Sequence, residues 1–150
     1  MQQDFDEEII DINTDKIPHQ LGHYSQAKKV GNLLFLAGQV ATDYIHGVAP
    51  EARTNADMGP WYESDMARQT EYILKNFKVL LEEAGSSMDH VVKAQVFMTD
   101  LSDWKDYNEV WKRYFKKPPV RTTVQVVGLL CPGALLEIDL TAVIPKPRAR

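Results

Sequence analysis

Two stretches near the C-terminal end alternate hydrophobic and polar residues with the two-residue period of a strand. They are residues 119–127, PVRTTVQVV, and residues 135–144, LLEIDLTAVI. Because successive side chains of a strand point to opposite sides, Glu137 lies opposite the core face formed by Leu136, Ile138, Leu140, Ala142 and Ile144. Arg121 follows two prolines, which place it near a strand start. The two strands therefore offer one cation and one carboxylate.

A period of three to four residues predicts two helices. The first begins after an N-cap serine, Ser64, and ends at Gly85, with an apolar stripe formed by Met66, Thr70, Ile73, Phe77, Leu80, Leu81 and Ala84. The second runs from Asp103 to Lys117, capped by Ser102 and ended by two prolines. It carries an aromatic face, interpreted as core, formed by Trp104, Tyr107, Trp111, Tyr114 and Phe115.

Further strands are predicted at residues 33–40 and 91–99, and a short edge strand at residues 8–13. Gly38 lies inside the first of these runs, where the missing Cβ lets a backbone or a ligand approach closely. Residues 41–64 contain turn formers without a sustained period, which predicts a long surface loop. Its Trp61 and Tyr62 would either form a lid or pin the loop to its neighbour.

The order of these elements predicts an α+β layer fold, a mixed sheet with two helices on one face. The whole chain, 1–150, is expected to form a single domain, with an N-terminal extension at residues 1–16 and the loop at residues 41–64. One layer of helices leaves the other face of the sheet open. Because Val124 and Val126 are too apolar to face water, we expect the chain to self-associate.

Composition narrows the classes of function. The formal net charge of −4 argues against a binder of nucleic acid, and no apolar run is long enough to span a membrane. Cys131 is the single cysteine, so no internal disulfide forms, and we expect a reducing, cytoplasmic setting and an inert thiol. The four histidines have no metal-ligand spacing, and no metal is expected.

Several blocks, in order along residues 18–145, resemble the RidA (YjgF/UK114) family of reactive-intermediate deaminases. They are Gly22-His23-Tyr24-Ser25-Gln26-Ala27, Leu36-Ala37-Gly38-Gln39, Gln69-Thr70, Glu83-Ala84-Gly85-Ser86, Val91-Val92-Lys93-Ala94-Gln95-Val96-Phe97, Tyr107-Asn108-Glu109-Val110-Trp111, Pro119-Val120-Arg121-Thr122-Thr123-Val124 and Leu136-Glu137-Ile138-Asp139. The resemblance implies a chorismate-mutase-like fold and a homotrimer with three clefts between subunits. It also implies hydrolysis of imines or enamines of 2-amino acids to 2-keto acids and ammonia, without a cofactor.

The resemblance also implies roles for single residues. Arg121 is similar to the arginine that holds the substrate carboxylate, and Glu137 to the glutamate that positions or activates water. Tyr24, Gly38 and Asn108 resemble residues of the cleft. From pattern alone the alternatives stay open: Arg121 and Glu137 as paired strand charges, Tyr24 as a packing residue and Asn108 as a structural hydrogen bonder.

Three features depart from the family pattern. Thr123 stands at a cleft position where a cysteine is frequent, and we expect it to contact the substrate there; the usual glycine-proline-tyrosine reads Gly22-His23-Tyr24, and the loop at residues 41–64 is longer. The loop is the departure expected to change the substrate.

The leading hypothesis is an imine or enamine deaminase. Alternatives are an aminomuconate-type deaminase that takes a larger dicarboxylate, and a protein that binds a small carboxylate without turnover. The weakest is an endoribonuclease, because the chain is acidic and lacks a basic stripe.

Overall fold

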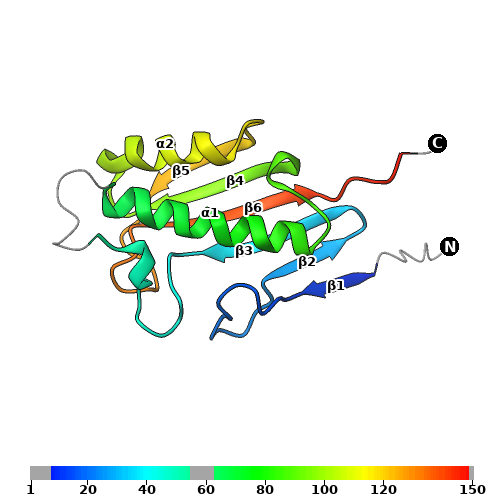
Figure 1. Cartoon of the computed structure of the whole chain (residues 1–150), viewed down its shortest axis with the longest axis horizontal. Helices are drawn as coiled ribbons and strands as arrows, with labels where there is room; N and C mark the ends of the chain where they lie inside the picture. The colour runs from blue at the N-terminus through cyan, green and yellow to red at the C-terminus, as the bar shows by residue number, and fades with distance from the viewer. Residues whose placement is uncertain (1–7, 55–62, 149–150) are drawn as a thin grey trace.

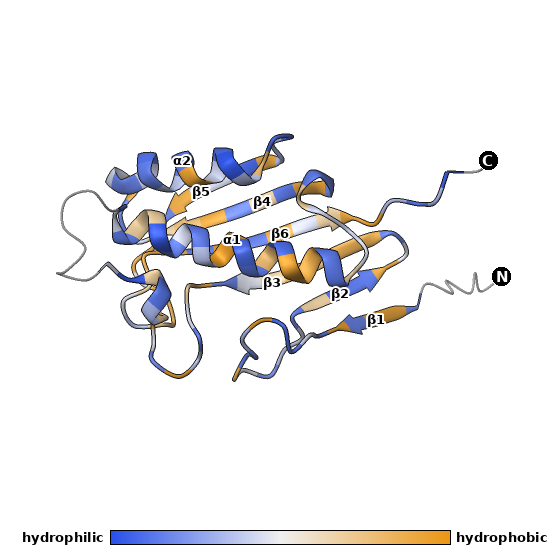
Figure 2. Ribbon diagram, in the orientation of Figure 1, coloured by the Kyte–Doolittle hydropathy of each residue, from blue (hydrophilic) through white to orange (hydrophobic). Residues whose placement is uncertain are grey.

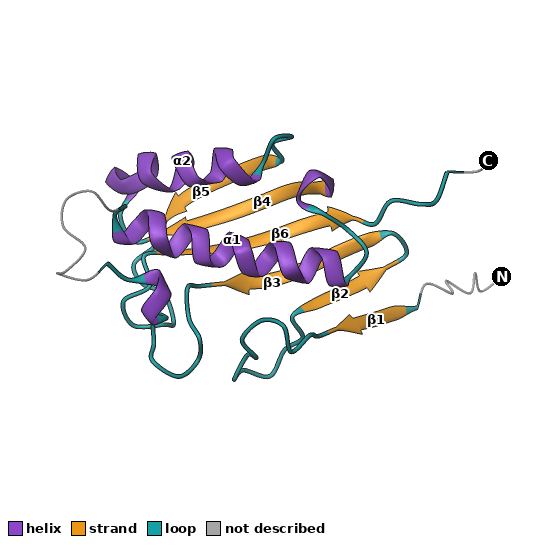
Figure 3. Ribbon diagram, viewed as in Figure 1, coloured by secondary structure: helices purple, strands orange, loops and turns teal. Residues whose placement is uncertain are grey.

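A six-stranded mixed sheet carries two helices on one of its faces (Figure 1). In this computed structural model, which describes residues 8–54 and 63–148, the chain begins with strands β1 (Ile9–Ile12), β2 (Ala27–Val30) and β3 (Leu33–Gln39). The elements that follow are α1 (Asp65–Glu83), β4 (Val91–Met98), α2 (Trp104–Tyr114), β5 (Val120–Gln125) and β6 (Leu136–Val143). Short 3-10 turns lie at η1 (Pro50–Ala52), η3 (Met88–His90) and η4 (Leu101–Asp103) (Figure 3). The predicted α+β architecture is confirmed.

The strands lie in the order β1-β2-β3-β6-β4-β5. Neighbours are antiparallel except β4 and β5, which are parallel because α2 carries the chain back between them. The last strand of the chain, β6, therefore lies in the middle of the sheet. Strand β5, which carries Arg121, lies at one edge, and the predicted edge strand β1 lies at the other.

The core fills the space between the sheet and the two helices. Alternate residues of β6 are buried toward the helices, as the period of the sequence predicts, and Leu136, Ile138, Leu140 and Ala142 have at most 1% of their surface exposed. The apolar stripe of α1 packs on them through Ile73, Leu74, Phe77, Leu80 and Leu81. Hydrophobic and hydrophilic colours both occur along the middle strands of the sheet and along both helices (Figure 2). Glu137 consequently lies on the side of the sheet away from the helices.

Both predicted ends of α1 are confirmed. The Ser64 hydroxyl accepts a hydrogen bond from the Ala67 N–H at 3.2 Å, which satisfies one of the free donors of the first turn. Past the other end, Gly85 has a φ of 82°, a conformation that costs glycine little.

The prediction of the second helix was wrong at both ends. Helix α2 runs from Trp104 to Tyr114. Ser102 belongs to the preceding η4 turn, where its N–H donates to the Asp100 carboxylate at 2.9 Å. The helix stops early because the residue before Pro118 disfavours helical angles, so the chain leaves the helix before it. Of the predicted aromatic core face, Tyr107, Trp111 and Phe115 are buried, but Trp104 is exposed.

Two other segments differ from the prediction. Strand β2 was not predicted as an element of its own, because residues 28–32, KKVGN, give the signal of a hairpin turn that leads into the next strand. Residues 41–54 are not simply a surface loop, since small apolar side chains anchor them in the core: Ala41, Val48, Ala49 and Ala52. The predicted roles of Trp61 and Tyr62 fall outside the described residues.

The face of the sheet away from the helices exposes apolar side chains. On β3, Leu33 and Phe35 are exposed, and the β4 and β5 strands add Val92, Val120 and Val124. Exposed apolar surface of this kind is typical of an interface. Self-association through this face stays a prediction.

Neither described helix is long and apolar enough to cross a membrane. Over residues 8–54 and 63–148, no group of three or more histidine, cysteine, aspartate or glutamate side chains is arranged to hold a metal ion.

Candidate active site

Arg121 lies on the helix side of the edge strand β5, against helix α2. Its Cζ is 5.1 Å from the ring centroid of Tyr107 and 5.1 Å from that of Trp111. Its Nη1 donates to the Asn108 side-chain oxygen at 3.0 Å. Cation–π contacts and this hydrogen bond hold the guanidinium in one place without neutralising its charge. We call Arg121, Asn108, Tyr107, Trp111 and Thr123 the arginine half-site.

Thr123 supports the arginine half-site through Tyr107. Its hydroxyl is 2.7 Å from the hydroxyl of Tyr107, a ring that is 1% exposed and lies under the guanidinium. Thr123 therefore fixes the platform on which Arg121 rests. Lys112, Lys116 and Pro119 line the hollow beside Arg121 and Asn108. The positive charges make this hollow suited to an anion.

Glu137 lies in the middle of the sheet, on the face away from the helices, and Gly38 of β3 makes room for it. A Cβ built on Gly38 would overlap with Oε1 of Glu137. The group that approaches Gly38 is the Glu137 side chain, not the backbone or ligand that was predicted. Burial, followed by the nearby charge of Asp139, raises the pKa of Glu137 above its usual value of 4.5.

Gly38, which adjoins this carboxylate, also lines a pocket with two tyrosines. The hydroxyl of Tyr24 is 3.2 Å from the hydroxyl of Tyr44, and both residues line a pocket together with Gly38. A Cβ on Gly22 would lie 2.6 Å from the Tyr24 ring, so that glycine gives the ring its space. We call Glu137, Gly38, Tyr24 and Tyr44 the glutamate half-site.

The two half-sites do not meet within one chain. Strand β4 separates β5 from β6, so the backbones of Arg121 and Glu137 lie about 10 Å apart across the strands. Along β4, Arg121 pairs with Ala94, whereas Glu137 pairs with Phe97. The side chains also point to opposite faces of the sheet. A single ligand can therefore contact both an Arg121 and a Glu137 only if the two come from different copies of the chain, or if the ligand extends round the edge of the sheet.

Tyr44 and the aromatic support of Arg121 were not predicted as parts of a site. Tyr44 lies in a loop without periodicity, so no pattern marks it. Tyr107 and Trp111 were assigned to the core, and they are buried there, but their rings also contact the guanidinium. The signal that could have found them is the four-residue spacing of Tyr107 and Trp111 on the helix, in the motif that also holds Asn108.

The fold and the site define an α+β protein with a held guanidinium on one face of its sheet and a partly buried carboxylate on the other. Comparison with known families identifies the class further. The family model described as Endoribonuclease L-PSP matches residues 14–144. The chain therefore belongs to this family, which includes the RidA (YjgF) proteins.

Individual relatives agree. A RutC family protein of Pyrococcus abyssi is 39% identical over 132 residues, 87% of this chain and 94% of the relative. Reactive Intermediate Deaminase A, chloroplastic, of Arabidopsis thaliana is 37% identical, over 89% of this chain and 65% of the relative. The crystal structure of RidA from an Antarctic Psychrobacter superimposes with a TM-score of 0.70 at 37% identity, covering 89% of this chain and 98% of that one. At the level of the family, these relatives support an imine deaminase.

Gln69 of α1 holds the segment that leads into Glu137. This side chain is 3% exposed; its amide donates to the Gly133 carbonyl at 3.1 Å and accepts from the Leu135 N–H at 2.8 Å. Both backbone groups come just before β6. One buried amide thus ties the start of the central strand to the helix above it.

We expect Gln69→Leu to lower the free energy of unfolding by about 2–4 kcal/mol, because two backbone groups near β6 lose their partner. Urea unfolding of the purified protein measures this. Lys78→Leu, on the exposed side of the same helix, is the control and should stay within about 0.5 kcal/mol. Equal stability of the two variants would contradict the prediction.

Proposed function

We propose that this protein hydrolyses imines, and enamines after protonation at carbon, that derive from 2-amino acids, releasing 2-keto acids and ammonia. The observation that carries the proposal is the preorganised guanidinium of Arg121, held by Tyr107, Trp111 and Asn108. A planar guanidinium binds a carboxylate through two parallel hydrogen bonds. A 2-imino acid presents its carboxylate beside the reacting carbon, so this contact also orients that carbon.

The chemistry then needs a base for water. Glu137 accepts a proton as the water oxygen bonds to C2 of the imine; the imine nitrogen gains a proton in the same step, which gives a carbinolamine. A second proton on that nitrogen, from solvent, makes ammonia a leaving group. As the C–N bond breaks, the carbinolamine hydroxyl loses its proton to Glu137 and the carbonyl of the keto acid forms. The glutamate gives its proton back in the same cycle, so no cofactor is consumed.

We further propose that the cleft forms between copies in a homotrimer, with Arg121 from one and Glu137 from another. Their separation on opposite faces of the sheet supports this arrangement, as do the exposed Phe35 and Val124 on the open face. Association would cover the apolar surface and would bring the two half-sites together.

Turnover of 2-iminopropanoate, made in situ by an amino-acid oxidase and trapped by semicarbazide, tests the function. We expect Arg121→Ala to lower kcat/KM roughly 10²-fold or more, because the charge-assisted contacts to the carboxylate are lost. Arg113→Ala removes an arginine that pairs with Glu63 and Glu71 outside both half-sites, and should keep wild-type activity. A folded Arg121→Ala protein with normal turnover would refute the proposal.

Mixing two inactive variants tests whether the cleft is shared. We expect Arg121→Ala and Glu137→Ala, refolded together in equal amounts, to recover about a quarter of the wild-type activity. Half of the chains keep Arg121 and the other half keep Glu137. A cleft that takes the two residues from different copies is therefore intact in about one case of four. Each variant refolded alone is the control. No recovery in mixed oligomers would show that the two groups do not come from different copies.

The pH profile tests the role of Glu137. A base must be ionised, so kcat/KM should fall as the pH falls through the pKa of Glu137, which burial and Asp139 raise in the single chain and the guanidinium of another copy would lower. Asp139→Asn removes a like charge that raises this pKa and should move the acid limb to lower pH. Glu137→Gln should have little activity at any pH. An acid limb that Asp139→Asn leaves in place would mean that another group titrates.

A further inference from the structure

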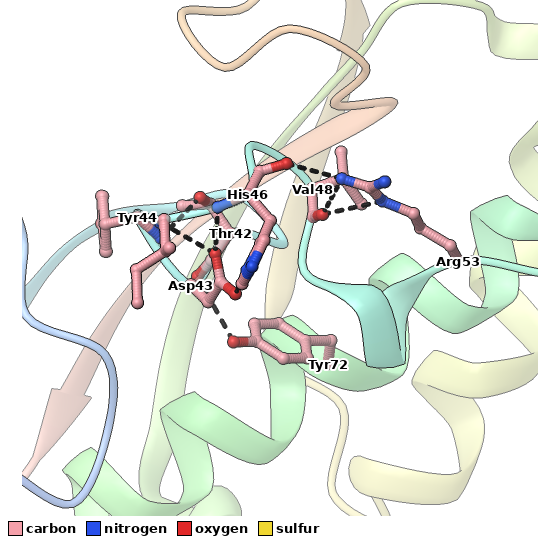
Figure 4. A network of polar contacts seen from close by, with 8 residues as sticks. Thr42, Asp43, Tyr44, His46, Val48, Arg53 and Tyr72 are labelled. Atoms are coloured by element: carbon pink, nitrogen blue, oxygen red, sulfur yellow. Dashed lines mark hydrogen bonds and ion pairs between the residues drawn. The ribbon is translucent and has the colours of Figure 1, made fainter.

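The loop after β3 holds a tyrosine in an uncommon backbone conformation. Tyr44 has a φ of 61°, and it is the one residue other than glycine with a positive φ among those described. Side chains disfavour this region, so the surrounding contacts must maintain it. The hydroxyl of Thr42 accepts the Tyr44 N–H at 2.9 Å, and the Asp43 carboxylate accepts the N–H groups of Ile45 and His46 (Figure 4).

More contacts fix both sides of the loop. The Nδ1 of His46 lies 2.6 Å from Oδ2 of Asp43, and the Arg53 guanidinium donates to the carbonyls of His46 and Val48 (Figure 4). From α1, the Tyr72 hydroxyl donates to the Thr42 carbonyl at 3.4 Å. The loop is therefore a rigid support, not a free connection.

This support presents the Tyr44 hydroxyl to Tyr24. The two oxygens are 3.2 Å apart, in the pocket that Gly38 also lines. Burial, then the contact with Tyr24, raises the pKa of Tyr44, and the Glu137 charge acts in the same direction. Tyr44 therefore stays neutral and keeps its proton for hydrogen bonding at any pH at which the protein works.

We propose that Tyr44 is a positioning residue for the reaction: it holds the Tyr24 hydroxyl in the pocket beside Glu137, where Tyr24 donates a proton to the substrate nitrogen. This inference rests on the proposed function. As the N–H bond forms, the Tyr24 O–H bond breaks, and the tyrosinate regains a proton from Glu137, which took one from the attacking water. Protons balance over the cycle. The sequence resemblance implied no role for Tyr44, and over residues 8–54 and 63–148 its hydroxyl makes the one side-chain hydrogen bond to the Tyr24 hydroxyl.

A double-mutant cycle of Tyr44→Phe, Tyr24→Phe and the pair, with 2-iminopropanoate as substrate, tests this role. We expect Tyr44→Phe to lower kcat about three- to tenfold with KM unchanged, the size of one lost hydrogen bond. Because Tyr44 acts through Tyr24, the double variant should be no slower than Tyr24→Phe alone. Tyr114→Phe removes a hydroxyl that donates to Glu71 outside the pocket and outside both half-sites, and should keep the wild-type kcat.

Two results would overturn the inference: wild-type kcat in Tyr44→Phe, or losses that simply multiply in the double variant. If the wild-type protein does not consume the imine, the proposed function fails by itself. The free energies of unfolding in urea of the same variants then test the contact between Tyr44 and Tyr24. A measurable coupling between the two substitutions keeps Tyr44 as the group that positions Tyr24, and additive effects remove it.

Discussion

The alternation of side chains in the central strand is the constraint on which the arrangement depends. Strand β6 pairs on both sides and buries Leu136, Ile138 and Leu140 against the helices, so Glu137 has to lie on the opposite face. If the register of β6 shifted by one residue, the Glu137 carboxylate would enter the core. The cost of burying that charge selects against such a shift. Arg121 is held on the helix side by Tyr107 and Trp111. No rotation of side chains brings the two charges together through the sheet.

Because the two half-sites are separated in one chain, the apolar open face has a role in the proposed function: it would bring copies of the chain together. An isolated chain leaves Phe35 and Val124 in water and leaves each half-site without its counterpart. Contact between copies would bury the apolar surface and complete the site in one step. Stability and catalysis would then both depend on contact through that face, so substitutions there would change both the stability and the activity.

The sequence-based analysis succeeded where short-range periodicity decides the structure. It predicted the burial pattern of β6, the position of Glu137 and both ends of α1, because each follows from side-chain spacing or from a local cap. It could not place Arg121, since the apolar residues of β5, Val120 and Val124, lie on the open face and polar residues face the helices. The side of Arg121 is marked by the contact between Thr123 and Tyr107, 16 residues apart. Tyr44 was missed because its role depends on a backbone angle and on a partner 20 residues away.

The electrostatics of Glu137 connect these observations. In one chain the carboxylate is partly buried and repelled by Asp139, so its pKa is raised and its ionised form is disfavoured. A guanidinium brought close by a second copy would favour the ionised form and lower that pKa. By linkage, ionisation of Glu137 would then strengthen the contact between copies, and the contact would supply the ionised base that the hydrolysis needs. A shared cleft would thus stabilise the ionised form of Glu137, which is disfavoured in one chain.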